Sequence, residues 1–269
     1  MIKEDSIMLK EGDPVKIADF SSRHVKSWIL FLEKDSEFST HRGKILHNDI
    51  IGHKYGERIP NIQGRLLILK PTPRDFLRKF KLKTQIMYED DSAIACNIAG
   101  ITKGMDVGEA GTGSGALTLF LASIVSPNGH VFSFDKNKEH QENAIKNLEM
   151  TGFRKYVSFL TQDIRAPLEL HDLDAFFLDF STPYEAIKFI EPVLKGGGHL
   201  ICFVPNWGQV EDTIHEIQEN PYLILQECFE LTRRNFIVDP QKHIMRPVFR
   251  DLVYSGILIH AIKILTPLR

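Results

Sequence analysis

The chain has 269 residues, of which 43% are hydrophobic and 25% charged, and its formal net charge is −2. This balance is typical of a globular protein and argues against a generic polyanion-binding protein, so any nucleic-acid contact must depend on a local basic surface. No apolar run approaches the roughly 18 residues that span a bilayer. The N-terminus lacks the apolar core of a signal peptide, and the cysteines are scattered without metal-ligand spacing. We therefore expect a cytoplasmic protein with reduced thiols, no membrane segment and no metal.

Residues 1–72 predict a small β-domain. Apolar and β-branched runs at 15–20, 27–32 and 65–69 are separated by turns that contain glycine and proline. No helical period of useful length interrupts them. A module of this size buries little core by itself, so we expect it to dock on the rest of the chain or on another subunit.

Residues 73–269 form the predicted second domain, which opens with a basic segment. Its basic residues are Arg74, Arg78, Lys79, Lys81 and Lys83. They alternate with Phe76, Leu77, Phe80 and Leu82, so the spacing predicts a short helix over 74–83 with an apolar seam and a basic face. That face is either simply solvated or contacts nucleic-acid phosphates, and the segment alone leaves both readings open.

The stretch that organises the second domain is residues 105–118, MDVGEAGTGSGALT. It predicts a buried strand to Ala110, a loop with Gly111, Gly113 and Gly115, and a helix from Ala116. Alternate glycines let the backbone turn sharply and leave no side chain between that backbone and a ligand. The helix N-terminus that follows favours an anion.

This glycine pattern is ambiguous between two cofactors. The spacing from Gly111 to Ala116 also satisfies a nicotinamide-type dinucleotide fingerprint, and Asp135 at the end of the next predicted strand suits a ribose in either kind of site. Glu109 and the third alternate glycine favour S-adenosylmethionine, which has no pyrophosphate and needs a loop passing close to its methionine part.

Beyond this loop, predicted strands and helices alternate, which is typical of a doubly wound, mostly parallel sheet. Strands are expected at 131–135, 157–163, 175–179 and 199–205, with helices at 139–150, 182–194 and 209–220. The run from Thr182 to Glu185 has the form of a capping box with proline at the first helical position. Two last strands, at 223–238 and 257–264, follow with no helix between them. That fits a final antiparallel pair, which a methyltransferase sheet has and a nicotinamide domain lacks.

Three acids stand at three successive strand ends: Asp135, Asp163 and Asp179. Each one alone is explained as a loop or turn residue. Together they lie where open α/β sheets bind ligands, beyond the carboxyl ends of the strands. We expect Asp135 to bind the ribose hydroxyls and Asp163 to accept from the adenine amino group of the cofactor. Asp179 points at the site of methyl transfer and is the catalytic candidate.

With these residues in place, the chain resembles the TrmI-type tRNA (adenine-N1)-methyltransferases, which modify adenine 58 of the T-loop. The resemblance covers nearly the whole chain. It rests on Thr40–Gly43, Ile50–Gly52, Tyr55–Gly56, Pro71–Pro73, Thr84–Tyr88, Glu109–Thr118 and Arg246–Pro247. The glycine loop alone would support only a methyltransferase.

The resemblance implies the class I S-adenosylmethionine methyltransferase fold, which is Rossmann-like with a mostly parallel seven-stranded sheet and an antiparallel last strand. It implies S-adenosylmethionine as donor, tRNA as substrate, a homotetramer and Asp179 as the catalytic aspartate. The cofactor-binding residues expected from the glycine loop and the resemblance are Gln85, Glu109, Gly111, Gly113, Ser114, Gly115, Leu117, Asp135, Asp163 and Asp179. Some members of the family also act on position 57.

The segments around the target base depart from the family pattern. The family's Tyr-x-Pro is Phe203-Val-Pro205 here, its Asp-Leu-Pro-x-Pro-Trp ends in Tyr184, and its late His-Thr-Gly begins with Tyr254. Adenine 58 must leave the tRNA elbow to react, and Tyr184, Phe203 or Trp207 is expected either to stack on it or to belong to the core. The basic segment, with Arg74, Arg78, Lys79 and Lys81, is expected to hold the tRNA, joined by Arg233, Arg234 and Arg250.

Three other functions share some of these features. A methyltransferase of the same fold acting on a protein or small molecule would not call for the basic segment or the β-domain. A non-catalytic tRNA-binding partner subunit would not need an intact glycine loop and all three acids. A nicotinamide dehydrogenase would bind reduced nicotinamide cofactor.

Overall fold

The computed structural model describes residues 8–21, 25–60, 62, 65–249 and 254–267. The chain divides into two compact units, residues 1–79 and 80–269. The sequence placed the division a few residues earlier, after residue 72. The difference arises because the short helix α1 (Pro73–Leu77) belongs to the first unit, where Asp75 accepts from Lys16 Nζ at 2.6 Å and Phe76 stacks on Phe31.

The first unit is built from short antiparallel strands. Its larger sheet has the order β2-β1-β5, from β1 (Pro14–Asp19), β2 (Lys26–Phe31) and β5 (Leu66–Leu69). A separate hairpin pairs β3 (Glu37–Thr40) with β4 (Gly43–Leu46), followed by the one-turn helix η1 (His47–Asp49). Ile17, Ile45 and Ile68 are fully buried between these pieces. The three strands expected from the sequence are confirmed.

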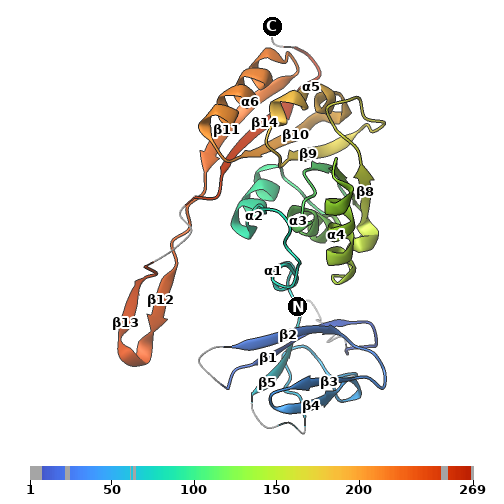
Figure 1. Ribbon diagram of the computed structural model, residues 1–269, viewed down its shortest axis with the longest axis vertical. Coiled ribbons are helices and arrows are strands. Elements are labelled where there is room, and N and C mark those ends of the chain that lie inside the picture. The colour runs from blue at the N-terminus through green and yellow to red at the C-terminus, as the bar shows by residue number, and fades with distance from the viewer. Residues whose placement is uncertain (1–7, 22–24, 61, 63–64, 250–253, 268–269) are drawn as a thin grey trace, which may run out of the picture. The chain divides into compact units, whose positions relative to one another are not determined.

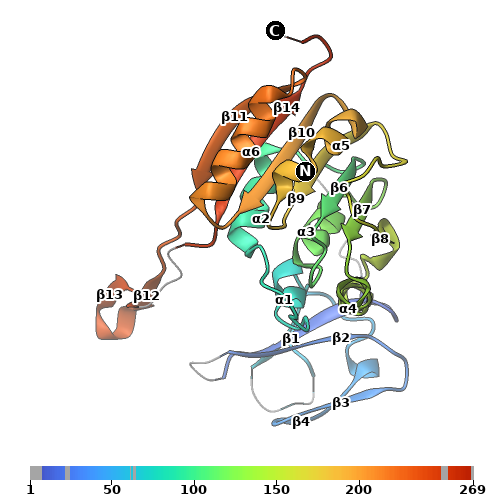
Figure 2. The ribbon, with the colours of Figure 1, turned by 45° about the horizontal axis from the view of Figure 1, so that its top comes forward.

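The second unit contains a seven-stranded sheet with the order β11-β14-β10-β9-β6-β7-β8. Its strands are β6 (Asp106–Ala110), β7 (His130–Asp135), β8 (Val157–Thr161), β9 (Leu173–Leu178), β10 (Leu194–Val204), β11 (Leu223–Glu230) and β14 (Ile257–Lys263). The pairs from β8 through β10 are parallel, and β14 runs antiparallel to both β10 and β11. Figure 2 shows β14 between β10 and β11. This confirms the predicted methyltransferase-type sheet.

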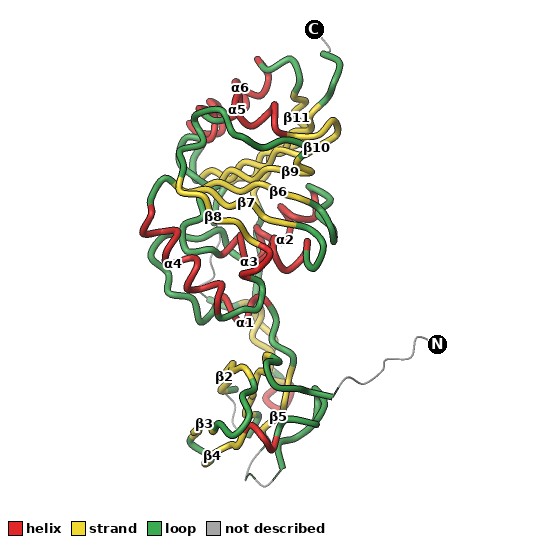
Figure 3. Tube along the Cα trace, turned by 90° about the vertical axis from the view of Figure 1, so that its right-hand side faces the viewer, coloured by secondary structure: helices red, strands yellow, loops and turns green. Residues whose placement is uncertain are grey.

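Helices cover both faces of this sheet (Figure 3). One face carries α2 (Glu89–Ile98), α3 (Ala116–Val125) and α4 (Lys138–Glu149), and the other carries α5 (Ile187–Ile190) and α6 (Trp207–Glu219). Strands buried on both faces read as near-continuous apolar runs, and Phe176, Phe177 and Leu200 are accordingly fully buried. The strand order reverses direction between β6 and β9, so the carboxyl ends of these strands border the expected ligand site.

The predicted helix over 74–83 is wrong beyond Leu77. Helix α1 begins with a capping box between Thr72 and Asp75 and ends at Leu77. From Lys81 to Tyr88 the chain forms neither helix nor strand. Tertiary hydrogen bonds replace helical ones: Lys81 N donates to Asn147 Oδ1 at 3.0 Å, and Asn143 Nδ2 donates to the Lys81 carbonyl at 2.9 Å.

The predicted helix over 182–194 is broken into three short turns. They are η3 (Pro183–Glu185), α5 and η4 (Glu191–Val193). The expected capping box does not form, since the Glu185 carboxylate accepts from the Thr182 hydroxyl and from Arg165 instead of returning to the backbone. Pro192, inside η4, prevents α5 from continuing as an α-helix, because its ring would clash with a helical carbonyl four residues earlier.

The segment between β11 and β14 contains a hairpin that the sequence analysis missed. Strands β12 (Phe236–Asp239) and β13 (Ile244–Pro247) pair antiparallel as a sheet of their own, joined by the turn η5 (Pro240–Lys242) and His243 in the left-handed conformation (Figure 1). The sequence analysis had treated residues 223–238 as one strand, whereas β11 ends at Glu230.

Candidate active site

The glycine loop joins β6 to α3 as predicted. Gly111, Gly113 and Gly115 all have positive φ, which L side chains rarely adopt. A Cβ on Gly111 would lie 2.0 Å from the Asp179 carbonyl oxygen, and a Cβ on Gly113 would lie 2.7 Å from Thr84 Oγ1. The loop therefore passes against the end of β9 so closely that only glycine fits.

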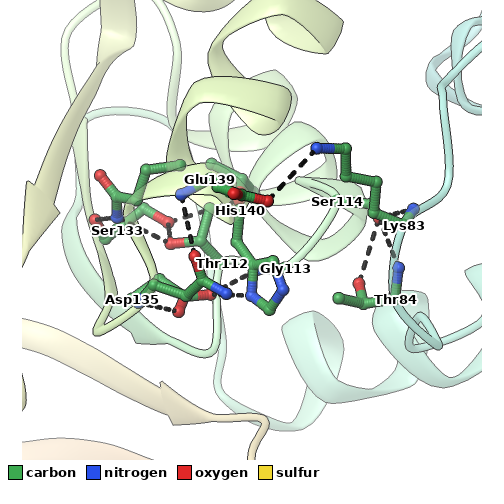
Figure 4. Close-up of polar contacts among 12 residues, drawn as sticks. Lys83, Thr84, Thr112, Gly113, Ser114, Ser133, Asp135, Glu139 and His140 are labelled. Carbon is green, nitrogen blue, oxygen red and sulfur yellow. Dashed lines mark hydrogen bonds and ion pairs between the residues drawn. The ribbon is translucent and has the colours of Figure 1, made fainter.

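Polar contacts fix the shape of this loop (Figure 4). Gly113 N donates to Asp135 Oδ2 at 3.0 Å, and the His140 ring lies 3.2 Å from the same oxygen. Ser114 is almost fully buried, and its hydroxyl accepts from Lys83 N at 3.0 Å and Thr84 N at 3.3 Å. Asp135 and Ser114 therefore hold the loop in place as well as standing at the predicted site.

Glu109 is a fully buried acid at the end of β6. Its Oε2 accepts from the Thr118 hydroxyl at 2.7 Å and from the Ser133 hydroxyl at 2.8 Å, whereas its Oε1 has no hydrogen-bond partner. Burial, aided by the charges of Asp179 and Asp135, raises the pKa of Glu109 to about 8 despite those two hydrogen bonds. An unpartnered buried carboxylate oxygen is costly and marks a place for a donor or a cation.

Asp179 follows β9 directly and is partly accessible. Desolvation by the surrounding protein, with a further contribution from the charge of Asp91, raises the pKa of Asp179 to about 7. Asp91 is a residue that the sequence analysis missed. It lies in the first turn of α2, is only 3% exposed and hydrogen-bonds to the Ser255 side chain. Burial also raises its pKa.

Two adjoining pockets bring most of the predicted cofactor-binding residues together. The smaller pocket is lined by Gln85, Glu109, Gly111, Gly113, Ser114, Leu117 and Asp179, among others. The larger one, with about 490 Å³ of empty space, has Asp135 and Asp163 in its wall and shares Gly111 with the first. Gly115 lines neither pocket. It forms the N-cap of α3 and lies against α4, where a Cβ would be 2.9 Å from Leu148.

In the larger pocket the carboxylate of Asp163 is held by Arg165. Hydrogen bonds from the Arg165 side chain and backbone, and then its charge, lower the pKa of Asp163 to about 2. The same guanidinium reaches Glu185, with Nη1 at 2.8 Å from Oε2. The sequence analysis assigned no role to Arg165 and placed Glu185 only in a helix capping box.

The predicted substrate-binding residues fall into different environments. Arg74, Arg78 and Lys79 are exposed in the first unit, and Lys81 is exposed in the second.

Of the aromatic candidates, Tyr184 is half-buried and Trp207 is 74% exposed at the start of α6. Phe203 is 8% exposed, and its ring fills the space beside Gly256, so it belongs to the packing of β10 against β14.

The remaining predicted arginines also differ from one another. Arg233 Nη1 donates to both carboxylate oxygens of Asp90, at 2.9 and 3.0 Å. Arg234 stacks on the Phe236 ring at 5.8 Å. Arg250 lies outside the described residues.

The three cysteines are free thiols, and burial raises the pKa of Cys96 to about 12. Within the described ranges, no cluster of histidine, cysteine and acidic side chains could hold a metal ion. In the same part of the chain, the helices are all too short or too polar to cross a membrane.

Known proteins match this chain over both of its units. A family described as the tRNA methyltransferase complex GCD14 subunit matches residues 64–251, and one described as TrmI-like N-terminal matches residues 8–59. The chain belongs to the GCD14 family. This confirms the resemblance drawn from the glycine loop and the N-terminal motifs.

Individual members and solved structures agree with this assignment. A catalytic subunit of tRNA (adenine(58)-N(1))-methyltransferase from Dictyostelium discoideum is 29% identical over 229 residues, which are 80% of this chain and 70% of the relative. A Thermotoga maritima structure described as a SAM-dependent O-methyltransferase is 31% identical, with a TM-score of 0.79 and 97% of each chain covered. The tRNA (m1A58) methyltransferase TrmI from Aquifex aeolicus is 25% identical, with a TM-score of 0.74, covering 97% of this chain and all of that one.

Proposed function

We propose that this GCD14-family chain is an S-adenosylmethionine-dependent tRNA methyltransferase that transfers a methyl group to N1 of adenine 58 in the T-loop. The observation that carries the proposal is the placement of Asp179. It stands at the end of β9, lines the pocket under the glycine loop and has a pKa raised to about 7. Family membership over residues 64–251 and the TrmI-like N-terminal match support tRNA as the substrate.

The residues present fit S-adenosylmethionine. Its methionine part carries an ammonium group, and Glu109 offers an unpartnered carboxylate oxygen in the wall of the smaller pocket. Its adenosine part needs acceptors for ribose hydroxyls and for the adenine amino group, which Asp135 and Asp163 supply in the larger pocket. The cofactor would contribute a methyl group already activated by a sulfonium charge.

Asp179 would act on the target base. The N1 atom of adenine attacks with its own lone pair, so no base is needed to deprotonate it. The base gains a positive charge in the reaction, and an ionised Asp179 that accepts from the exocyclic amino group would orient the ring and stabilise that charge. With a pKa near 7, Asp179 is only partly ionised at neutral pH in the free protein, and a bound cation would favour its charged form.

The test is transfer of labelled methyl from S-adenosylmethionine to an unmodified tRNA transcript and to the same transcript with adenine 58 replaced. We expect label on the first transcript only, and 1-methyladenosine at position 58 in its nuclease digest. Label on both transcripts would mean that the chain methylates a nucleotide other than adenine 58, and position 57 would be examined first. No label on either, with cofactor still bound, would favour a partner subunit or a different methyl acceptor such as a small molecule or protein.

We also infer that the chain works as a homo-oligomer, with a homotetramer expected from the resemblance. The β12–β13 hairpin supports this inference. Four of its apolar side chains and that of the adjoining Phe249 are 37–86% exposed, the four being Phe236, Val238, Ile244 and Met245. An isolated two-stranded hairpin is marginal in water, so a second copy is the occupant we expect on this surface.

Light scattering after size exclusion tests the oligomer. The wild-type chain should elute as a tetramer, and Met245→Glu should give smaller species. The control is Met150→Glu, an exposed methionine at the end of α4. A wild-type monomer, or equal masses for the wild type and Met245→Glu, would contradict the inference.

A further inference from the structure

Two loops border the mouth of the larger pocket, and hydrogen bonds from the Arg165 side chain connect them. The loop after β8 contributes Asp163 and Arg165 to the pocket wall, and the loop after β9 contributes Phe180 and Thr182. Glu185 lies just beyond, in η3. These loops follow strands that are not neighbours in the sheet, since β6 and β7 lie between β9 and β8, so no strand pairing joins the two loops directly.

The guanidinium of Arg165 spans both loops. Toward Asp163, Nη2 donates to Oδ2 at 2.6 Å, Nε donates to Oδ1 at 2.9 Å, and the Arg165 backbone N–H donates to Oδ1 at 3.0 Å. Toward the other loop, Nη1 donates to Glu185 Oε2 at 2.8 Å, and the Thr182 hydroxyl donates to the same oxygen at 3.0 Å. The guanidinium therefore donates to the Asp163 carboxylate through Nε and Nη2 and to the Glu185 carboxylate through Nη1.

This arrangement is more specific than an ordinary surface ion pair. Exposed pairs contribute little on average, but a guanidinium that grips a carboxylate through two parallel hydrogen bonds fixes the plane of that carboxylate. A carboxylate has about four lone-pair positions. Three N–H groups of Arg165 occupy Asp163, two of them on Oδ1, with Nε also 3.1 Å from Oδ2, so about one acceptor position is left, on Oδ2. The adenine amino group can use that position without displacing the guanidinium.

We propose that Arg165 is a positioning residue for the cofactor: by gripping Asp163 and tying it to Glu185, it holds the acceptor for the adenine amino group in a fixed orientation at the pocket mouth. This inference rests on the proposed use of S-adenosylmethionine. Arg165 touches no reacting atom, so it acts on cofactor affinity and leaves the chemical step alone. Glu185 acts through Arg165 and has a smaller effect.

Calorimetric titration of S-adenosylmethionine and S-adenosylhomocysteine tests the proposal on the full chain. Arg165→Gln should bind both ligands about tenfold more weakly, the loss expected when an oriented charge-assisted hydrogen bond is removed. Glu185→Gln should show a smaller loss in the same direction. Arg165→Lys should bind the two ligands more tightly than Arg165→Gln but more weakly than the wild type. The lysine ammonium keeps the positive charge but cannot donate two parallel hydrogen bonds to one carboxylate.

The matched control is Lys195→Gln. It removes a cation of similar exposure, Lys195, whose Nζ lies 2.7 Å from Asp174 Oδ1 at the opposite ends of the strands. Its affinity should equal that of the wild type. In turnover assays, Arg165→Gln should raise the KM for the cofactor and leave kcat at saturation unchanged, a split that a general loss of structure would not give.

Each result decides the proposal. Wild-type affinity in Arg165→Gln, or a fall in kcat without a change in KM, would overturn it while leaving the proposed function intact. A wild-type protein that binds neither ligand would overturn the proposed function, and the inference with it. If Arg165→Gln melts well below the wild type, Glu185→Gln tests the same bridge from its other end.

Discussion

Asp91 lies close enough to Asp179 for the negative charge of Asp91 to raise the pKa of Asp179. The two acids come from different parts of the chain, the first turn of α2 and the end of β9. Desolvation is the largest cause of the raised pKa of each. With its pKa raised to about 7, Asp179 keeps a proton over part of the neutral range unless a cation joins it. The proposed reaction brings a sulfonium and then a methylated base to this place.

Removing the charge of Asp91 should therefore make Asp179 easier to ionise. We expect the acidic limb of the pH profile of kcat/KM, which reports the free enzyme, to lie near pH 7 in the wild type and to move to lower pH in Asp91→Asn. The control is Asp90→Asn, which removes the neighbouring carboxylate that is already paired with Arg233. Superimposable profiles for the wild type and Asp91→Asn would mean that Asp91 does not influence the reacting group.

Replacement of Asp179 should separate chemistry from binding. Asp179→Ala should lower kcat by about 100-fold or more, the loss typical when a group that stabilises transition-state charge is removed. Affinity for S-adenosylhomocysteine should change little, because Glu109, Asp135 and Asp163 remain. Single-turnover transfer to tRNA and calorimetric binding measure the two quantities. Loss of both would assign Asp179 a structural role instead.

The sequence predicted the glycine loop and the three strand-end acids because each depends on local chemistry. Gly111 and Gly113 mark a turn that only glycine can make, and Asp135, Asp163 and Asp179 each end or follow a buried apolar run. Parallel strands place such ends at one edge of the sheet, so the topology alone brings them together.

The residues that sequence analysis missed depend on contacts between distant segments. Asp91 is the third acid of a helix start, where charge is ordinarily explained by the helix dipole. Arg165 has no local signature, since its second partner, Glu185, lies 20 residues away. Glu185 itself was assigned to a capping box, because the sequence pattern does not reveal that Arg165 competes for its carboxylate. The β12–β13 hairpin was missed because its four-residue strands are too short for a clear alternation.

Gly111 lies so close to the Asp179 carbonyl oxygen that its replacement can be compared with that of Gly12, a glycine in open space. Gly111→Ala would bring a Cβ within 2.0 Å of the Asp179 carbonyl oxygen, and neither backbone can move without disturbing β6 or β9. Gly12 has a similar positive φ, but a Cβ there would meet nothing within 4 Å.

Both alanine variants should lose about 1 kcal/mol of stability from backbone strain, and the contact with the Asp179 carbonyl oxygen should add to the loss in Gly111→Ala. Only Gly111→Ala should in addition lose cofactor binding and methyl transfer. Thermal unfolding and calorimetric titration of the two variants check this. Normal cofactor binding by Gly111→Ala would show that the loop and the end of β9 are not held as tightly as the structure indicates.

Glu109 should make the cofactor-free protein less stable as pH rises. Its pKa is raised from 4.5 to about 8 in the folded state, so the native protein keeps a proton that the unfolded chain has already released. Stability then falls between about pH 4.5 and pH 8, by about 1.4 kcal/mol for each pKa unit of the shift at most. Asp179, with its pKa raised to about 7, adds to the fall in the same direction.

Glu109→Gln removes the titrating group and keeps an oxygen that can accept from Thr118 and Ser133. The melting temperature of the cofactor-free protein should therefore decline less steeply from pH 5 to pH 8.5 in Glu109→Gln than in the wild type. Glu149→Gln, at the exposed end of α4, should follow the wild-type curve. Parallel curves for Glu109→Gln and the wild type would mean that ionisation of Glu109 does not destabilise the folded protein. Its unpartnered oxygen would then give no support for a cation-binding role.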